Sequence, residues 1–257
     1  MTRLLTMAYG VCAYVLFLVT FLWAIAFVLN LPIATTIDGV ASNGGARAPL
    51  AEALIVNLAL LGLFAVQHSI MARRWFKRWL AGIMSRALER STFVLAATAA
   101  LALLLWQWRP IAEPVLWSVS DPGLAGVLGA LAWVGWGVVL VSTFLISHFE
   151  LFGLQQVYAR LRNRPLPAPE FRTPFFYRYV RHPIYVGFLL AFWSTPHMTA
   201  GHLLFAIGTT GYILVGIWFE ERDLIAQFGD RYRFYREQVG MLLPRRRRDR
   251  QVRRSDS

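Results

Sequence analysis

The sequence has a single cysteine, Cys12, and few charged residues for its 257 positions. Cys12 lies inside an apolar run, and one thiol excludes both an intrachain disulfide and a cluster of thiolate metal ligands. Charged residues make up 16% of the chain and hydrophobic residues 57%, whereas soluble proteins usually have about 25% and about 45–50%. This composition places the chain among membrane proteins.

Acidic residues are especially scarce, at 14 against 26 Lys and Arg, so the net charge is +12. A charge of this size can indicate a nucleic-acid-binding protein, but here the basic residues lie between apolar runs and at the C-terminus. That distribution is typical of cytoplasmic loops, which also contact anionic lipids. We therefore expect membrane lipids, and no nucleic acid, as partners.

Apolar runs that approach or reach the length needed to cross a bilayer recur along the chain. They are Met7–Leu29, Leu50–Ile70, Ser91–Trp108, Gly123–Ser147, the shorter Pro183–Thr195, and Gly201–Phe219. A few residues around Pro196 join the last two runs, which predicts a tight helical hairpin. The predicted fold is an all-α integral membrane protein with about six transmembrane helices.

Six spans place both termini on the same side of the membrane. All of the Lys and Arg residues except Arg47 and Arg109 then fall on that side, which the positive-inside rule identifies as the cytoplasm. The loop Ala34–Pro49 is expected to be external and mobile. We expect residues 1–147 to form a four-helix scaffold, residues 148–244 a cofactor-binding and catalytic module, and residues 245–257 a disordered basic tail.

A polar motif, Arg181 to Gly187, opens the hairpin. Pro183 suits the first position of a helix, where backbone N–H groups and the helix dipole favour a carboxylate. His182 and Tyr185 are three residues apart, so both can face one side of the first turn. Gly187 lets a ligand or another helix approach closely.

Glu220 and Glu221 close the hairpin at the same membrane face and supply negative charge. Together with the helix start they offer a matched site to a zwitterionic ligand with a cationic group, such as a methionine-like sulfonium. Taken singly, a His-Pro helix start and an interfacial Glu-Glu pair each occur without any ligand. The aromatic motif Phe228-Gly229-x-x-Tyr232-x-x-Tyr235, which follows directly, makes the combination more specific.

Three motifs carry a resemblance to a known group of proteins. They are Arg181-His182-Pro183-Ile184-Tyr185-Val186-Gly187, Glu220-Glu221-Arg222-Asp223-Leu224, and Gly229-Asp230-Arg231-Tyr232-Arg233-Phe234-Tyr235. The chain resembles the membrane methyltransferase superfamily of isoprenylcysteine carboxyl and phospholipid methyltransferases, to which nitric-oxide-cluster membrane proteins are related. Through His148–Leu154 and Phe192–Phe205, it most resembles the bacterial methanethiol S-methyltransferases.

The resemblance implies S-adenosylmethionine as the methyl donor, S-adenosylhomocysteine as its product, and methanethiol as the small volatile thiol converted to dimethyl sulfide. It also implies a bacterial cytoplasmic membrane location with the active site facing the cytoplasm. The residues implied near the cofactor are His182, Pro183, Tyr185, Gly187, Glu220 and Glu221. No metal site is expected.

The thiol must lose a proton, because an alkanethiol is mostly protonated at neutral pH. His148 and His182 are the candidate bases, with Arg181 or Arg222 as electrostatic support and His68 as a third candidate base. His197 and His202 are expected at the outer end of the hairpin. The sequence leaves the choice of base and the oligomeric state open.

Several other functions fit parts of the sequence. The methyl acceptor could be a lipid or a prenylated cysteine. Sterol reductases share a similar hairpin but use a nicotinamide cofactor, so the fold alone does not decide the chemistry. His68 and His148 could be axial ligands of a haem. A transporter is disfavoured because the polar residues gather at one face and no span carries a charged residue at its middle.

Overall fold

A computed structural model describes residues 2–39, 48–166 and 170–245. The longer helices are α1 (Arg3–Val28), α2 (Leu50–Ala72), α4 (Arg86–Gln107), α5 (Pro122–Ile146), α8 (Pro183–Trp193) and α9 (Ala200–Phe228). The shorter elements are α3 (Arg74–Ile83), α6 (His148–Leu151), α7 (Leu154–Leu161), α10 (Asp230–Gln238), the 3-10 turn η1 (Phe175–Arg178), β1 (Val115–Ser118) and β2 (His197–Thr199). The predicted all-α membrane fold is confirmed.

Within the described residues, five helices are long and apolar enough to cross a membrane, namely α1, α2, α4, α5 and α9. The fifth predicted span is the short one. Its helix α8 has 11 residues and is therefore only about 16 Å long, against a hydrocarbon core of about 30 Å. The backbone leaves the helix at Ser194, two residues before Pro196, so α8 reaches only partway across the bilayer.

The last span is longer than the sequence predicted. Helix α9 continues past Phe219 to Phe228 and ends at Gly229, whose φ of 57° and ψ of −131° suit glycine alone. Glu220 and Glu221 therefore lie within a helix, more than a turn before its end. This placement fixes the directions of their side chains more firmly than a helix terminus would.

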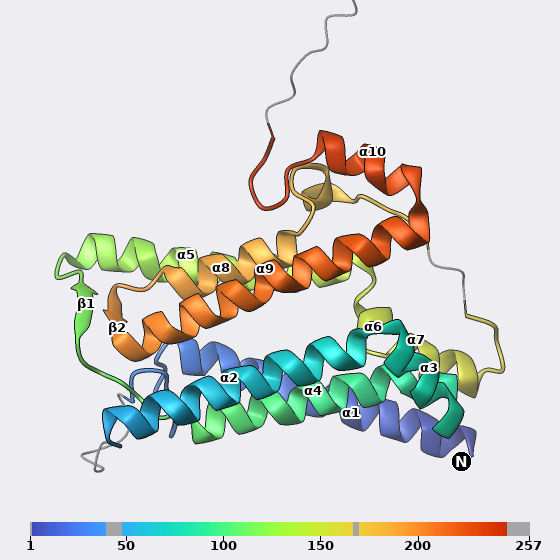
Figure 1. The fold of residues 1–257 in the computed structure, drawn as a ribbon, viewed down its shortest axis with the longest axis horizontal. Helices are drawn as coiled ribbons and strands as arrows, with labels where there is room; N and C mark the ends of the chain where they lie inside the picture. The colour runs from blue at the N-terminus through green and yellow to red at the C-terminus, as the bar shows by residue number, and fades with distance from the viewer. Residues whose placement is uncertain (1, 40–47, 167–169, 246–257) are drawn as a thin grey trace, which may run out of the picture.

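The helices form two layers (Figure 1), with α1, α2 and α4 in one and α5, α8 and α9 in the other. Helix α5 packs along α8, and α4 packs against both α1 and α2. Helices α3, α6, α7 and α10 gather at the end of the bundle marked by the N-terminus, while β1 and β2 lie at the opposite end. The predicted boundary between a scaffold and a catalytic module at residue 147 stays a prediction. It would assign α5 and its packing partner α8 to different parts of the chain.

Glycine sets the spacing of the α5–α8 pair. A Cβ atom on Gly187 would lie 2.6 Å from the carbonyl oxygen of Gly135 and 2.8 Å from a side-chain carbon of Val139. A Cβ atom on Gly135 would lie 2.6 Å from the carbonyl oxygen of Gly187. The backbones thus approach closely, as small residues allow in membrane helix pairs. Gly187 serves helix packing, one of the two roles that the sequence allowed.

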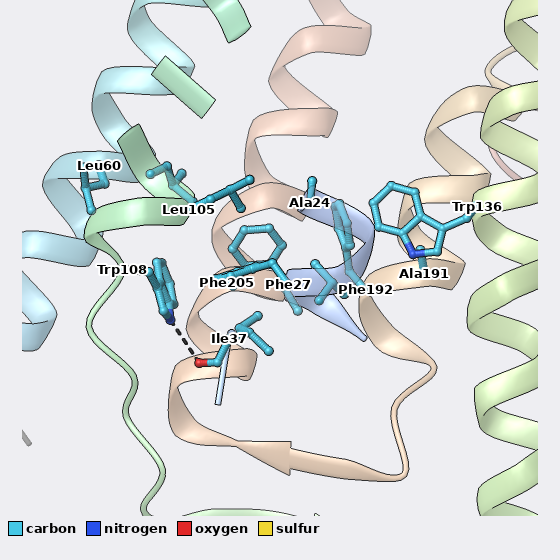
Figure 2. Packing of buried hydrophobic residues seen from close by; sticks show 13 residues of the cluster. Ala24, Phe27, Ile37, Leu60, Leu105, Trp108, Trp136, Ala191, Phe192 and Phe205 are labelled. Atoms are coloured by element: carbon cyan, nitrogen blue, oxygen red, sulfur yellow. Dashed lines mark hydrogen bonds between the residues drawn. The ribbon is translucent and has the colours of Figure 1, made fainter. Parts of the chain in front are cut away.

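Aromatic residues fill the core between the layers towards the β1–β2 end (Figure 2). Phe27, Trp108 and Phe205 pack edge to face or tilted, with ring centroids 5.8–6.1 Å apart. The Trp108 indole donates a hydrogen bond to the carbonyl oxygen of Ile37 at 3.1 Å. These contacts connect α1, α4 and α9.

The start of the loop Ala34–Pro49 is packed, which corrects part of its predicted mobility. Ile37 is fully buried, and the Asp38 carboxylate accepts hydrogen bonds from Asn30 at 2.6 Å and Thr199 at 2.5 Å. Burial alone would raise the pKa of Asp38, but these bonds and the neighbouring His202 imidazole outweigh it and lower the pKa. Residues 40–47 and most of the predicted basic tail, residues 246–257, lie outside the described residues.

Candidate active site

The start of α8 is held by the chain that follows α10. Pro183 occupies the first turn of α8, as predicted, and His182 stands at the N-cap position without a capping bond from its side chain. The backbone N–H groups of Arg181 and His182 donate to the carbonyl oxygens of Gly240 at 2.9 Å and Met241 at 3.2 Å. In the first turn itself, the N–H groups of Tyr185 and Val186 both donate to the carbonyl oxygen of His182 at 3.1 Å, which leaves fewer backbone donors for a carboxylate than the sequence suggested.

Glu221 is the centre of a buried charge network. Its Oε1 accepts hydrogen bonds from Nε of Arg181 at 2.7 Å and from Nε2 of His182 at 3.2 Å, and its Oε2 lies 3.8 Å from Arg236. The side chains of Arg181 and Glu221 are only 10% and 12% exposed. Such a pair holds its geometry firmly, because separating the charges would leave a buried charge without a partner.

Glu220 has a different environment one residue earlier. It accepts a hydrogen bond from the Tyr185 hydroxyl at 3.0 Å, and Nδ1 of His182 lies 3.8 Å from the same carboxylate oxygen. The rings of His182 and Tyr185 are 5.7 Å apart, which confirms that both face one side of the first turn. Since the Glu220 side chain is 46% exposed, its carboxylate is accessible to a ligand.

Tyr235 connects α10 to the segment that precedes α8. The Tyr235 hydroxyl donates to the carbonyl oxygen of Tyr177 at 2.5 Å, and the Tyr177 hydroxyl reaches the carbonyl oxygen of Ser142 at 3.5 Å. Burial raises the pKa of Tyr235 to about 12, so its hydroxyl keeps its proton as a donor. The aromatic motif after Glu221 thus connects α10, through Tyr177 of η1, to the end of α5.

His148 contacts two hydroxyl groups rather than the two glutamates. Its Nδ1 is 2.8 Å from the Thr143 hydroxyl and its Nε2 is 2.8 Å from the Tyr14 hydroxyl. The Thr143 hydroxyl donates its proton to the carbonyl oxygen of Leu140 at 2.7 Å, so it must accept from Nδ1–H. The Nε2 lone pair of His148 then accepts from Tyr14. Burial lowers the pKa of His148, which favours the neutral ring.

Arg222 faces away from the two glutamates. Its guanidinium lies 4.7 Å from the ring centroid of Trp218 on the exposed side of α9. Of the two arginines predicted as electrostatic support, Arg181 is the one that contacts Glu221 directly. The catalytic roles of both arginines stay predictions.

His68 lies where α2 meets α4 and α9. Its ring centroid is 4.8 Å from that of Phe93, 5.5 Å from Phe64 and 6.1 Å from Tyr212. Because both ring nitrogens of His148 are engaged, the pair His68 and His148 does not offer two available axial haem ligands in this arrangement.

Sequence reasoning did not identify three residues that complete the network. Arg236 approaches Glu221, the Gly240 carbonyl takes the Arg181 N–H, and Tyr177 receives the Tyr235 hydroxyl. The two residues of each contact lie about fifteen to about sixty positions apart in the sequence, so local spacing does not predict these contacts.

The comparisons with known proteins agree with the resemblance in these motifs. The family model described as NnrU protein matches residues 56–240. The chain belongs to the NnrU protein family. A protein of Mycobacterium tuberculosis named methanethiol S-methyltransferase is 54% identical, over 95% of this chain and 98% of its own length. Methanethiol S-methyltransferase 1 of Bradyrhizobium diazoefficiens is 53% identical, over 95% of this chain and 84% of its own length.

Membership of the NnrU family confirms the superfamily that the sequence predicted. No solved structure matches this chain. The family match begins in α2 and ends at Gly240, so it includes His68, His148 and both halves of the hairpin. The two relatives extend the similarity to almost the whole chain.

Proposed function

We propose that this protein transfers a methyl group from S-adenosylmethionine to methanethiol, giving dimethyl sulfide and S-adenosylhomocysteine. The observation that carries the proposal is the unequal pair Glu220 and Glu221. Glu221 is neutralised by Arg181, whereas Glu220 keeps an accessible negative charge beside Tyr185. The printed names of the two relatives support methanethiol as the acceptor.

The residues at the site fit a ligand that carries positive charge. Arg181 and Arg236 both approach Glu221, whereas Glu220, the half-exposed carboxylate, has no arginine beside it. A Cβ atom on Gly216 would lie 3.8 Å from the Tyr185 hydroxyl, so a glycine lines the approach to this hydroxyl. An ammonium or sulfonium group next to Glu220 would be stabilised, more so in a partly dry environment.

S-adenosylmethionine, when bound, supplies a methyl group already activated by its sulfonium. The chain's own residues then have two tasks, which are positioning and deprotonation. Arg181 and Glu221 fix the His182 ring through its Nε2, and Tyr185 fixes the Glu220 carboxylate. A neutral imidazole accepts the thiol proton. His148 and His182 remain the candidates named by the sequence, although the ring nitrogens of both already face partners.

A membrane location suits both substrates of this reaction. Methanethiol is small and apolar enough to cross lipid, whereas S-adenosylmethionine is polar and would arrive from the cytoplasm. We place the protein in the bacterial cytoplasmic membrane with the Glu220 end of the bundle facing the cytoplasm. The apolar outer surfaces of α1, α2 and α5 would contact lipid.

The test is to incubate the purified, detergent-solubilised protein with S-adenosylmethionine and methanethiol and to measure dimethyl sulfide in the headspace. We expect product from the wild type and an affinity for S-adenosylhomocysteine that falls about tenfold or more in Glu220→Gln. Glu237→Gln, an exposed glutamate on α10, is the matched control and should behave as the wild type. Binding without product would indicate a lipid or prenylcysteine acceptor instead, and no binding would remove the methyltransferase function.

A further inference from the structure

Two of the five histidines, His68 and His202, have a buried Nδ1 with no hydrogen-bond partner among the described residues, and the Nδ1 of His202 lies 3.9 Å from the carboxylate of Asp38. Both nitrogens of His148 are hydrogen-bonded, and His182 faces the two glutamates. His197 lies in β2 and His202 in the first turn of α9, at the opposite end of the bundle. The remaining histidine, His68, has a buried Nδ1 with no hydrogen-bond partner in the part of the chain that the structure describes.

The surroundings of His68 suit a small apolar molecule. Three aromatic rings, those of Phe64, Phe93 and Tyr212, surround the imidazole and come from α2, α4 and α9. Arg90 on α4 lies close by, with its guanidinium 5.0 Å from the centroid of Phe93. A buried polar atom without a partner calls for an explanation, and a bound hydrogen-bond donor is one. A thiol carries one weakly acidic donor on an apolar body.

One face of α9 connects His68 with the proposed cofactor site. Tyr212, Gly216 and Glu220 follow each other at intervals of four residues and so lie along one face of the helix. Glu220 accepts a hydrogen bond from Tyr185, and Gly216 lies opposite the same hydroxyl. Tyr212 is the residue of this face that contacts His68. The distance along the axis from Glu220 to Tyr212 is about 12 Å.

We propose that the thiol binds beside Tyr212, where α2, α4 and α9 meet, and that Nδ1 of His68 accepts its proton. This inference rests on the proposed function, and it assigns the base to a residue other than His148 and His182. The thiol's S–H bond breaks, and the proton goes to the neutral imidazole. The sulfur forms a bond to the methyl carbon as the carbon–sulfonium bond breaks, with that electron pair staying on the departing sulfur. His68 later releases the proton to water.

The arrangement gives each histidine near the site a separate task. His182 is a positioning residue, because its contacts go to Glu220 and Glu221 on the neighbouring helix. His148 connects α1 with the end of α5 through Tyr14 and Thr143. His68 alone combines a buried, unpaired nitrogen with contact to the face of α9 that carries Glu220.

The test compares thiols of different acidity in His68→Phe, which keeps an aromatic ring among its neighbours. Methanethiol needs a base, whereas an aromatic thiol is already largely ionised at pH 8. We expect His68→Phe to lose about 100-fold or more in turnover of methanethiol and less than about 10-fold with the aromatic thiol. His197→Phe, an exposed histidine at the other end of the bundle, is the control and should leave both rates unchanged.

A second readout needs no turnover. Ultraviolet absorption of the thiolate is measured when methanethiol binds to the protein loaded with an unreactive amine analogue of S-adenosylmethionine. The wild type should give the thiolate signal, and His68→Phe should not, while the affinity for S-adenosylhomocysteine stays within about 3-fold. If this variant does not fold, as shown by lost affinity for S-adenosylhomocysteine, His68→Gln replaces it in both measurements.

The outcomes separate the inference from the proposed function. An inactive wild type overturns the proposed function, and the role of His68 with it. An active wild type whose His68→Phe variant keeps its rate with methanethiol overturns the inference alone. Equal losses with both thiols do so as well, because a residue that only supports packing would slow both reactions alike.

Discussion

Glu220 and Glu221 are adjacent in the sequence but differ in what they contact. Glu221 is nearly buried and is held by Arg181 and His182, whereas Glu220 is half-exposed and contacts Tyr185. Adjacent positions on a helix point about 100° apart, so one side chain can stabilise the fold while the other faces a ligand. In the proposed function, Glu221 therefore has a structural role and Glu220 a binding role.

Replacing Glu221 should destabilise the protein more than replacing Glu220. Glu221→Gln removes the charge that pairs Arg181, and hydrogen bonds to charged groups contribute about 1.5–3 kcal/mol. We expect a loss of about that size in the free energy of unfolding, measured by denaturant titration in detergent. Glu220→Gln should change it by less than about 0.5 kcal/mol, since the site is exposed. Equal losses would contradict this division of roles.

The buried His148 predicts how stability depends on pH. Its pKa is lowered in the folded protein by burial, so the unfolded chain binds a proton more readily. The stabilising effect of the neutral ring is full above about pH 6.5 and is lost as the pH falls below that value. His148→Gln should flatten the decline of the melting temperature between pH 7 and pH 5. His197→Gln should leave the decline as it is, because His197 is exposed.

At the level of helices, the glycines of α5 and α8 determine how close the two backbones lie. Gly187→Ala should separate the helices, because the added Cβ would lie 2.6 Å from the carbonyl oxygen of Gly135 and 2.8 Å from Val139. Overpacking of this kind costs about 1–3 kcal/mol. We expect a lower melting temperature, and a weaker affinity for S-adenosylhomocysteine, since α8 also carries His182 and Tyr185.

Gly137→Ala is the matched control for this prediction. Gly137 lies on α5 two residues from Gly135, and an added Cβ would meet no other described atom within 4 Å. Replacing a helical glycine by alanine favours the helix by about 0.5–1 kcal/mol. The control should therefore be neutral or slightly stabilising. A similar loss in both variants would contradict the close-packing explanation, because an added Cβ on Gly137 meets no described atom within 4 Å.

The helices also show how far the sequence could predict the structure. The start of α8 was predictable, because Pro183 suits only the first turn. Its early end was predicted to within two residues, at Thr195, but the run was counted as a span although the helix has only 11 residues, too few to cross the bilayer. The end of α9 was placed at Phe219, where the apolar run ends, but the polar turns beyond it stay helical because they pack against α10 and the start of α8.

The site was predictable in part for a similar reason. His182, Tyr185, Glu220 and Glu221 come together because the hairpin is short and local spacing determines which faces meet. The position of His148 depends on Tyr14, which is more than one hundred residues away in the sequence. Contacts over such distances in the chain are set by tertiary packing, which periodicity and spacing do not encode.

For the molecule as a whole, the orientation in the membrane rests on charge. Nearly all basic residues gather on the side predicted to be cytoplasmic, and the ends of the bundle differ accordingly in the structure. Arg73, Arg90 and Arg181 lie at the end with α3, α6 and α10, whereas β1 and β2 close the other end. If the orientation is correct, Glu220 and the proposed cofactor site face the cytoplasm, where S-adenosylmethionine is made.

The single cysteine makes this orientation simple to test. In a Cys12→Ser background, Ser118→Cys places one exposed thiol in β1 and Ser85→Cys places one before α4, at opposite ends of the bundle. A membrane-impermeant maleimide added to spheroplasts should label the thiol at position 118 and leave the thiol at position 85 unlabelled until the membrane is opened. The reverse pattern would place Glu220 outside the cell, away from its proposed cofactor, and would contradict the charge argument together with the proposed reaction.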